Sequence, residues 1–309
     1  MPHFRDDLPR WQQLITPRWL ACLLAGQAVR AAPASHWCLL EVDCGAPEAF
    51  GRSHIPGAAY LDTQRLEDGR FWNKVDDAAL LRLLLGLGIR HDTTVILYGR
   101  NMTAAARAAH LMLYAGVTDV RLLDGGFAAW RRAGLPCAHG APRHYPPVTR
   151  FGAVFPGCPH YLVNAHQAKA LLRQADGALA SIRTWDEFSG KTSGYRYILA
   201  KGDIPGARWG RAGQGTDVNN MSDFHSPDGT MKPAEEISRF WRDEGLHPGL
   251  QTAFYCGTGW RASVAFFYAW LMGWERISVY DGGWYEWSHE AHAAVTHGLG
   301  NGQITNPVL

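Results

Sequence analysis

The phrase LLDGGFAAW, at residues 122–130, returns later in the chain as VYDGGWYEW, at residues 279–287. Two more phrases recur in the chain, HIPGA at 54–58 as DIPGA at 203–207, and TTVILYG at 93–99 as LQTAFYC at 250–256. The offset is 157 residues both from Asp124 to Asp281 and from Gly99 to Cys256, which chance would rarely give. The chain is therefore expected to be a diverged tandem repeat.

Strand-like and helix-like segments alternate within each copy. In the first copy, residues 38–43 and 119–125 are rich in the side chains typical of buried strands, whereas residues 76–88 and 103–116 carry apolar side chains at helical spacing. Such alternation predicts an α/β fold in which helices cover both faces of a parallel sheet.

The repeat also suggests where the domains begin and end. We expect one domain at residues 1–140, a proline-rich linker at 141–160 and a second domain at 161–309. The second copy has extra polar, glycine-containing residues on both sides of its DIPGA phrase. Loops held on a rigid scaffold often carry binding groups, so the second copy is the better candidate for a site.

Bulk composition excludes several classes of function. The 309 residues carry 30 Lys plus Arg against 28 Asp plus Glu, so the formal net charge of +2 does not favour a nucleic-acid partner. No apolar segment reaches the roughly 20 residues that a membrane-spanning helix needs. Residues 18–32 could imitate an export signal, but their apolar spacing favours an amphipathic first helix. A cytoplasmic protein is expected, with a periplasmic one as the alternative.

The six cysteines are scattered through a long chain and form no CxxC pair. This pattern predicts neither a disulfide framework nor a zinc ribbon. His289 and His292 share a helical face, but no third ligand is evident nearby. No metal site is therefore predicted.

Cys256 differs from the other cysteines because it lies between a strand-like run and a helix-like run. The start of that helix would direct its positive end and its free N–H groups at the thiol, which favours the thiolate. Gly257 and Gly259 allow the backbone N–H groups to turn inward, and Arg261 could supply a cation. The loop is therefore a candidate site for a nucleophilic cysteine.

Loop length distinguishes between two cysteine chemistries. In phosphatases of the Cys–Arg type, five residues lie between the catalytic cysteine and the arginine, whereas four residues lie between Cys256 and Arg261. The smaller cradle fits a single sulfur atom on the cysteine better than a phosphate. A Cys–Arg phosphatase is kept as a minor alternative.

On these residues the sequence resembles the rhodanese family of thiosulfate and 3-mercaptopyruvate sulfurtransferases. The duplicated IPGA and DGG phrases and the loop from Cys256 to Arg261 carry the resemblance. It implies two tandem rhodanese-like domains and a persulfide formed on Cys256, and it implies no cofactor. It also implies that the C-terminal domain is catalytic, because Gly99 stands at the N-terminal position equivalent to Cys256.

Within the family, Cys256-Gly257-Thr258-Gly259 is closer to the mercaptopyruvate enzymes than to the thiosulfate enzymes. In that subfamily the loop hydroxyl belongs to an Asp–His–hydroxyl chain. The resemblance places Asp43 and His54 at the matching positions, so that they and Thr258 could relay protons between the domains. An interdomain hydrogen-bond pair without a catalytic role is the alternative reading of Asp43 and His54.

The resemblance also suggests how a donor is bound. Arg183 matches a family arginine expected to bind the anionic group of the donor, and Arg196, in an insertion, could add a second cation. The sequence departs from the family pattern at Trp260 and Arg261, which replace the usual Val-Thr and should alter the entrance. Ser181 replaces a usual Asp, which removes one possible salt-bridge partner of Arg183.

The sequence therefore predicts a sulfurtransferase that moves a sulfane sulfur from thiosulfate or 3-mercaptopyruvate to cyanide or a thiol. The alternative is a persulfide carrier that receives sulfur from a cysteine desulfurase and passes it to an acceptor protein. The tail at residues 296–309 has no periodicity and is expected to be mobile or to act as a docking strap.

Overall fold

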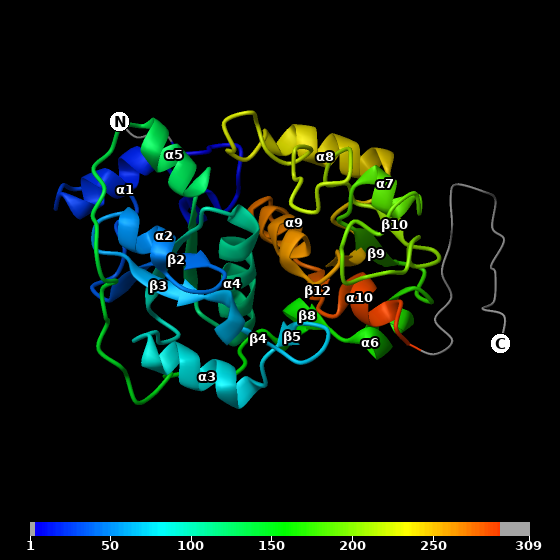
Figure 1. Cartoon of the computed structure of the whole chain (residues 1–309), viewed down its shortest axis with the longest axis horizontal. Coiled ribbons are helices and arrows are strands. Elements are labelled where there is room, and N and C mark those ends of the chain that lie inside the picture. The colour runs from blue at the N-terminus through cyan, green and yellow to red at the C-terminus, as the bar shows by residue number, and fades with distance from the viewer. Residues whose placement is uncertain (1–3, 291–309) are drawn as a thin grey trace.

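The computed structural model describes residues 4–290. Two lobes lie side by side along the long axis, the first half of the chain in one and the second half in the other (Figure 1). His292 and the tail at 296–309, for which predictions were made above, lie outside the described residues. Among the described residues, no helix is long and apolar enough to cross a membrane.

The first lobe is built on a five-stranded sheet with the order β1-β7-β6-β2-β3, in which every pairing is parallel. Its strands are β1 (Leu14–Ile15), β2 (Trp37–Asp43), β3 (Ala59–Asp62), β6 (Thr94–Tyr98) and β7 (Asp119–Leu123). Its helices are α1 (Pro17–Leu24), α2 (Glu48–Arg52), α3 (Asp77–Gly86), α4 (Met102–Ala115) and α5 (Gly126–Arg132). A small antiparallel hairpin of β4 (Glu67–Asp68) and β5 (Asn73–Lys74) stands apart from this sheet.

The second lobe repeats this topology. Its parallel sheet has the order β10-β9-β11-β12-β8, with the strands β8 (Leu162–Val163), β9 (Gly177–Ser181), β10 (Arg208–Trp209), β11 (Gln251–Tyr255) and β12 (Ile277–Tyr280). Its helices are α6 (Ala165–Leu171), α7 (Trp185–Phe188), α8 (Ala234–Asp243), α9 (Trp260–Leu271) and α10 (Gly283–Trp287). The predicted α/β fold with two parallel sheets is confirmed, whereas the short strands β1, β3, β8 and β10 lacked a sequence signal.

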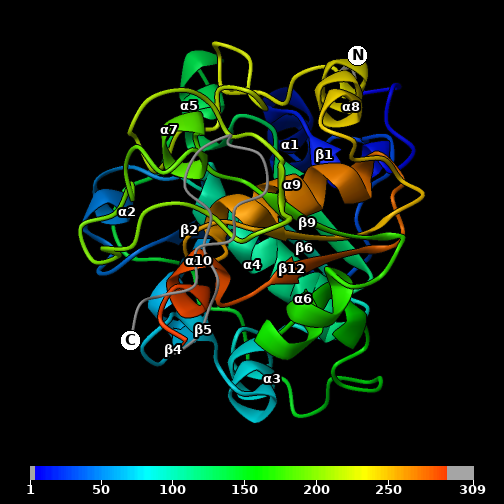
Figure 2. The same ribbon diagram turned by 90° about the vertical axis from the view of Figure 1, so that its right-hand side faces the viewer.

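The two lobes meet through α4 and α9, which lie against each other at the centre of the molecule in both views (Figures 1 and 2). Every residue from Thr103 to Ala115 is buried, because α4 has its own sheet on one side and α9 on the other. Alanines fill much of α4, which lets the aromatic side chains of α9 approach closely. The ring of Phe266 meets His110 edge-on, with 4.7 Å between centroids.

Reciprocal hydrogen bonds reinforce this interface. Asp124 Oδ1 accepts from the backbone N–H of Met231 in the other lobe at 2.8 Å, and Asp281 Oδ2 accepts from that of Lys74 at 2.8 Å. Lys74 and Met231 are themselves 157 residues apart, so the two contacts are equivalent under the repeat. The aspartate of each DGG phrase therefore accepts a backbone N–H from the opposite domain, so the two copies of the phrase make equivalent contacts.

The segment between the domains has no helix or strand from the end of α5 to the short turn at Pro159–Tyr161. It is nevertheless held along the first lobe, where Arg143 N–H donates to Ala58 at 3.0 Å and Val148 N–H to Leu85 at 3.0 Å. The domain limits at 140 and 161 stay a prediction.

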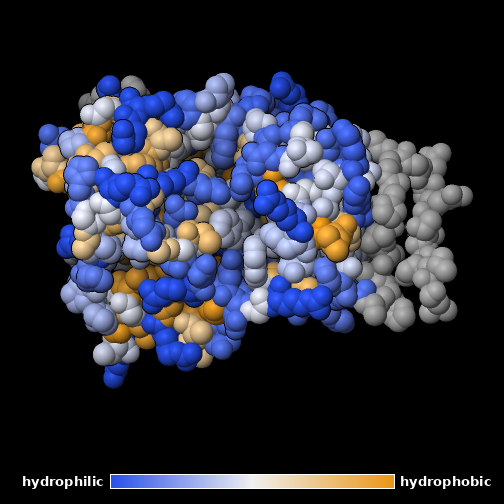
Figure 3. Space-filling view, in the orientation of Figure 1, coloured by the Kyte–Doolittle hydropathy of each residue, from blue (hydrophilic) through white to orange (hydrophobic). Residues whose placement is uncertain are grey.

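Hydrophilic side chains cover most of one face of the second lobe, while apolar side chains gather on that face of the first (Figure 3).

The buried aspartate of the first DGG phrase should make folding stability depend on pH. Burial raises the pKa of Asp124 from 3.8 to about 6, so the folded chain holds this proton more tightly than the unfolded chain does. Stability should therefore fall as the pH rises from about 4 to about 6. Asp124→Asn keeps an oxygen that accepts from Met231 N–H but has no carboxyl to titrate. The free energy of unfolding, measured in urea, should therefore fall less between pH 4 and pH 6 than in wild type. The exposed control Asp92→Asn should show the same slope with pH as wild type. Identical slopes in wild type and Asp124→Asn would contradict this.

Candidate active site

Cys256 follows β11 directly, and three residues, 257–259, separate it from α9. Its side chain is buried, with 1% of the residue exposed. The carbonyl of Cys256 accepts from Trp284 N–H at 2.8 Å, and that of Gly257 accepts from Tyr285 N–H at 3.0 Å. The first turn of α10 thus fixes the loop from its carbonyl side.

The opposite side of the loop is rich in free donors. None of the backbone N–H groups of residues 257–261 donates to an acceptor within residues 4–290. Gly259 caps α9 with φ of +93°, a left-handed conformation that glycine adopts at low cost. Free donors at the start of a 12-residue helix form a cradle that stabilises an anion. The local sequence determines this loop conformation, because glycines occupy the turn between a buried strand and a buried helix.

Arg261 lies beside this cradle, but its charge is already neutralised. Its guanidinium makes two hydrogen bonds of 2.8 Å to the two carboxylate oxygens of Glu187 and a third of 2.8 Å to the hydroxyl oxygen of Tyr195. Burial alone would raise the pKa of Glu187, yet Arg261 outweighs it and holds that pKa below its usual value. Arg261 is therefore a buried, paired cation that shapes the site.

Arg183 does not have the position expected of a donor-binding residue. It is fully buried, and its guanidinium donates to the Gly202 carbonyl at 2.7 Å and to Asp203 Oδ2 at 3.0 Å. Ser181 also donates to Asp203, at 2.8 Å. Asp203 thus provides the salt-bridge partner that the sequence lacked at Ser181, and the role of Arg183 in donor binding stays a prediction. Its burial and pairing show that it stabilises the fold around the loop.

A pocket of about 400 Å³ opens next to the loop, at the junction of the two lobes. Its lining residues are Trp72, Thr103, Gly194, Tyr195, Arg196, Tyr197, Val218, Asn219, Thr258, Trp260 and Arg261. Trp72 and Thr103 come from the first domain, so both domains are needed to form it. Arg196 is exposed and has no ion pair within residues 4–290, which makes it the free cation of this lining.

Aromatic rings line the mouth of this pocket. Trp72 and Tyr197 contact each other with ring centroids 4.7 Å apart, and Tyr195 and Tyr197 with centroids 5.4 Å apart. Trp72 has φ of +56°, an uncommon conformation for a bulky residue that concentrates at functional sites. Gly257 is required here, because a Cβ on it would lie 2.4 Å from the ring of Tyr195.

Asp43 and His54 are not joined to Thr258 by any hydrogen bond among the described residues. The ring of His54 stacks on Phe50 with centroids 3.8 Å apart, and its Nδ1 lies 2.9 Å from the Phe50 carbonyl oxygen. Asp43 Oδ1 accepts from the N–H of Cys44 at 2.9 Å. Thr258 lines the pocket instead, so the three-residue relay stays a prediction without contacts that support it.

The equivalent loop of the first domain is filled by its own side chains. Arg100, which stands where the second copy has Gly257, donates to Glu41 Oε1 at 2.8 Å and covers the ring of Phe127 at 4.3 Å. A Cβ on Gly99 would lie 2.4 Å from the Asn101 carbonyl oxygen. This loop therefore has neither a nucleophile nor room for a side chain at its position.

Sequence reasoning missed four residues that shape the site. Glu187 lies three residues after Thr184, the spacing of a capping box, so its sequence position indicates only the start of a helix. The two residues do form that capping box. Tyr195 and Tyr197 lie in an insertion without a repeat partner, and Trp72 belongs to the other domain. A Tyr-rich insertion in the copy that carries Cys256 is the signal that could have indicated the two tyrosines.

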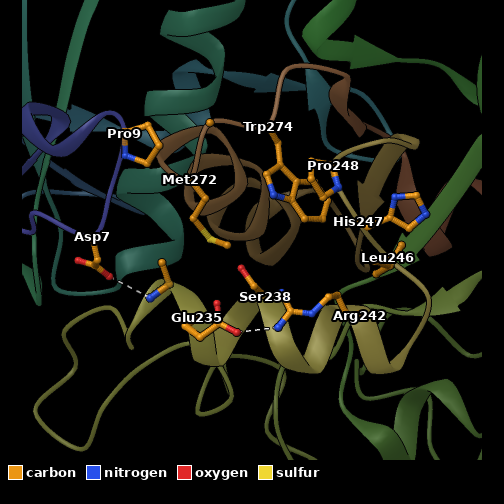
Figure 4. A pocket seen from close by; sticks show the side chains of 12 residues that line it. Asp7, Pro9, Glu235, Ser238, Arg242, Leu246, His247, Pro248, Met272 and Trp274 are labelled. Carbon is orange, nitrogen blue, oxygen red and sulfur yellow. Dashed lines mark hydrogen bonds and ion pairs between the residues drawn. The ribbon is translucent and has the colours of Figure 1, made fainter.

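A larger hollow, of about 570 Å³, lies at the far end of α9 from Cys256 (Figure 4). Met272 and Trp274 line it together with residues of α8 and of the N-terminal segment. Its charged side chains are paired, since Glu235 accepts from Arg242 at 2.6 Å and Asp7 accepts from the backbone N–H of Ala234 at 3.1 Å. No cysteine of the described chain lines it, and Cys256 lies at the other end of α9, so it is not the candidate site. Within residues 4–290, no group of three or more His, Cys, Asp or Glu residues could hold a metal ion.

Comparisons with known proteins agree with this geometry. The profile of the rhodanese-like domain matches residues 28–133 and 164–290. The chain is 52% identical over 297 residues to the thiosulfate sulfurtransferase YnjE of Escherichia coli (strain K12), covering 96% of this chain and 68% of that protein. It is 31% identical over 269 residues to the sulfur carrier protein TtuD of Thermus thermophilus, covering 81% of this chain and 87% of that protein.

Two solved structures are similar over nearly the whole chain. The crystal structure of YnjE matches with a TM-score of 0.91 and 52% identity, covering 94% of this chain and 70% of that chain. An anaerobic ergothioneine biosynthesis enzyme from Chlorobium limicola, in complex with its natural substrate trimethyl histidine, matches with a TM-score of 0.90 and 36% identity, covering 95% of this chain and 72% of that chain.

Proposed function

Because the chain belongs to the rhodanese family and is a tandem-domain sulfurtransferase, we propose that Cys256 is the residue that carries the transferred sulfur. The single observation that supports this most is the cradle of free backbone N–H groups at residues 257–261, beside a buried thiol at the start of α9. Such donors favour the thiolate, which is the nucleophilic form of cysteine. The N-terminal domain has a filled loop and serves as a partner in forming the pocket.

The proposed reaction has two steps. The thiolate of Cys256 attacks the outer sulfur of thiosulfate, the S–S bond of the donor breaks, and sulfite leaves with the electron pair. With 3-mercaptopyruvate the C–S bond breaks instead, and the enolate that leaves takes up a proton. An acceptor, cyanide or a thiolate, then attacks the outer sulfur of the persulfide and Cys256 leaves as a thiolate. The cradle stabilises the anionic sulfur in both steps.

Donor binding falls to different residues than the family pattern implied. Arg196 lines the pocket without an ion-pair partner in the described chain, so it can bind the sulfonate or carboxylate of the donor. Thr258 contributes a hydroxyl to the same pocket and can donate to the donor or to the leaving group. Glu187 already neutralises Arg261, so the loop has no excess positive charge for a phosphate dianion. This argues against the Cys–Arg phosphatase.

Sulfur relay between proteins is the alternative for the same cysteine. The similarity to a protein named as a sulfur carrier favours it, and a cysteine desulfurase would then be the donor. A cytoplasmic location agrees with such a partner and is part of this proposal. Cys256 is buried, so the outer sulfur of a persulfide, about 2 Å farther out, is the atom that a partner would reach.

A second candidate activity is transfer of the persulfide sulfur to a carbon of a trimethylated amino acid. The observation that favours it is the aromatic pocket mouth, with Trp72, Tyr195, Tyr197 and Trp260 available to bind a trimethylammonium group. Arg196 could bind the carboxylate of such a substrate. With trimethyl histidine as the substrate, the outer sulfur of the persulfide would form a C–S bond to a carbon of the imidazole ring. That carbon would lose its proton, and Cys256 would leave as a thiolate.

Substitution of the cysteine tests the main proposal. Wild type incubated with thiosulfate and cyanide should produce thiocyanate, and its intact mass after thiosulfate alone should increase by one sulfur atom. Cys256→Ser should abolish both signals, whereas Cys158→Ser, at a half-buried cysteine outside the pocket, should keep them. Full turnover by Cys256→Ser would disprove the assignment. A persulfide that forms from a desulfurase but not from thiosulfate would favour the relay.

The role of Arg196 can be separated from that of Arg183. Arg196→Ala should raise the KM for thiosulfate about five-fold and leave the unfolding midpoint unchanged, because it removes one exposed charge contact of about 1 kcal/mol. Lys191→Ala removes an exposed cation from the same insertion and should change neither quantity. Arg183→Ala should lower the midpoint instead, because it leaves Asp203 buried and without its cation. A KM that Arg196→Ala leaves unchanged would contradict the assignment.

The second candidate activity has its own assay. Persulfide-loaded wild type is mixed with trimethyl histidine, and the thiolated product is measured by mass spectrometry. We expect product with wild type and at least a several-fold loss with Trp72→Ala, since the aromatic face that binds the cation is gone. Absence of product with the loaded wild type would exclude this activity while leaving the thiosulfate reaction intact.

A further inference from the structure

The β4–β5 hairpin belongs to the first domain in sequence, but it also contacts the second domain. Phe71, near its tip, meets the ring of Tyr285 edge-on with centroids 5.2 Å apart, and the next residue, Trp72, lines the pocket. At the base of the hairpin, Lys74 N–H donates to Asp281, two residues before α10. The hairpin therefore extends over the catalytic loop from the other domain.

Glu67, at the opposite base of the hairpin, makes a direct bond to the loop. Its Oε1 accepts from the indole N–H of Trp260 at 2.7 Å, and its side chain is 9% exposed. Trp260 is the residue just before Arg261 and lines the pocket. A carboxylate of the catalytically silent domain thus fixes the orientation of a rim residue of the catalytic one.

Arg107, on α4, connects the two ends of this arrangement. It is fully buried and donates from Nε to Glu67 Oε1 at 3.0 Å and from Nη2 to Asp281 Oδ1 at 2.5 Å. Its Nη1 has no partner among the described residues and lies 3.1 Å from where a Cβ on Gly259 would be. Glu67, Trp260, Asp281 and Arg107 therefore surround the back of the loop.

We propose that Glu67 is a positioning residue, which acts across the domain interface to hold the indole of Trp260 and thereby sets the size of sulfur acceptor that reaches the persulfide. This inference rests on the proposed function of Cys256. If the indole were not held, its ring could rotate into the pocket that Thr258 and Tyr195 also line. Small acceptors would still pass, whereas bulky thiols would be obstructed.

The form of the bond decides which variants are informative. Burial raises the pKa of Glu67 to about 7, while Arg107 and the Trp260 N–H act in the opposite direction. An uncharged side chain with an oxygen in the same place should therefore serve nearly as well. Glu67→Gln keeps that oxygen and Glu67→Leu removes it, at similar side-chain size.

The experiment measures steady-state kinetics with thiosulfate as donor and either cyanide or glutathione as acceptor. Glu67→Leu should raise the KM for glutathione about five-fold, the effect of losing one hydrogen bond, with kcat and the KM for cyanide unchanged. Glu67→Gln should restore wild-type values. Glu235→Leu, at an exposed carboxylate on α8, is the matched control and should change nothing.

Two checks keep the outcome unambiguous. Trp260→Phe removes the N–H donor while keeping an aromatic ring, so it should reproduce the glutathione effect even if Glu67→Leu does not fold. Equal KM values for glutathione in wild type, Glu67→Leu and Trp260→Phe would overturn the proposal. A rise in the KM for cyanide as large as the rise for glutathione in Glu67→Leu would also overturn it. Absence of a persulfide on wild-type Cys256 would instead disprove the proposed function.

Discussion

The packing of α4 against α9 is the constraint on which the rest of this molecule depends. Each helix starts at the loop that follows the central strand of its own sheet, so their contact brings the two loops to one interface. The aspartates of the two DGG phrases hold this arrangement by accepting backbone N–H groups from the opposite lobe. A buried N–H without its acceptor costs about 1–3 kcal/mol, so both contacts fix the relative position of the domains.

Two copies of one fold have diverged at corresponding positions of the loop. Where the second copy has a glycine next to its thiol, the first has Arg100, which binds Glu41 and fills the space. The first copy contributes to the pocket through two segments outside the recurring phrases, the β4–β5 hairpin and the start of α4. The domain without a cysteine at this loop position remains part of the site, because Trp72 and Thr103 line the pocket.

Charge pairing decides which cations can act at the site. Arg183 and Arg261 are both buried, and a buried cation is tolerated only with a partner, here Asp203 and Glu187. Arg196 is exposed and pays no such penalty, so it is free to meet an anion from solution. The electrostatic work at the thiol is left mainly to the backbone N–H groups of the loop, which are fixed in place before any substrate arrives.

The sequence by itself determined the duplicated α/β fold, the two main parallel sheets and the position of Cys256 between a strand and a helix, because these follow from periodicity and from glycine placement in short segments. It also predicted roles for Arg196 and Thr258, and both line the pocket. Only the tertiary structure decided that Arg183 is buried and paired with Asp203, that Asp43 and His54 make no hydrogen bond to Thr258 among the described residues, and that Glu67, Arg107 and Trp72 approach the loop. Those outcomes depend on burial and on contacts across the interface, and no local pattern records which charged side chain meets which partner when two domains pack together.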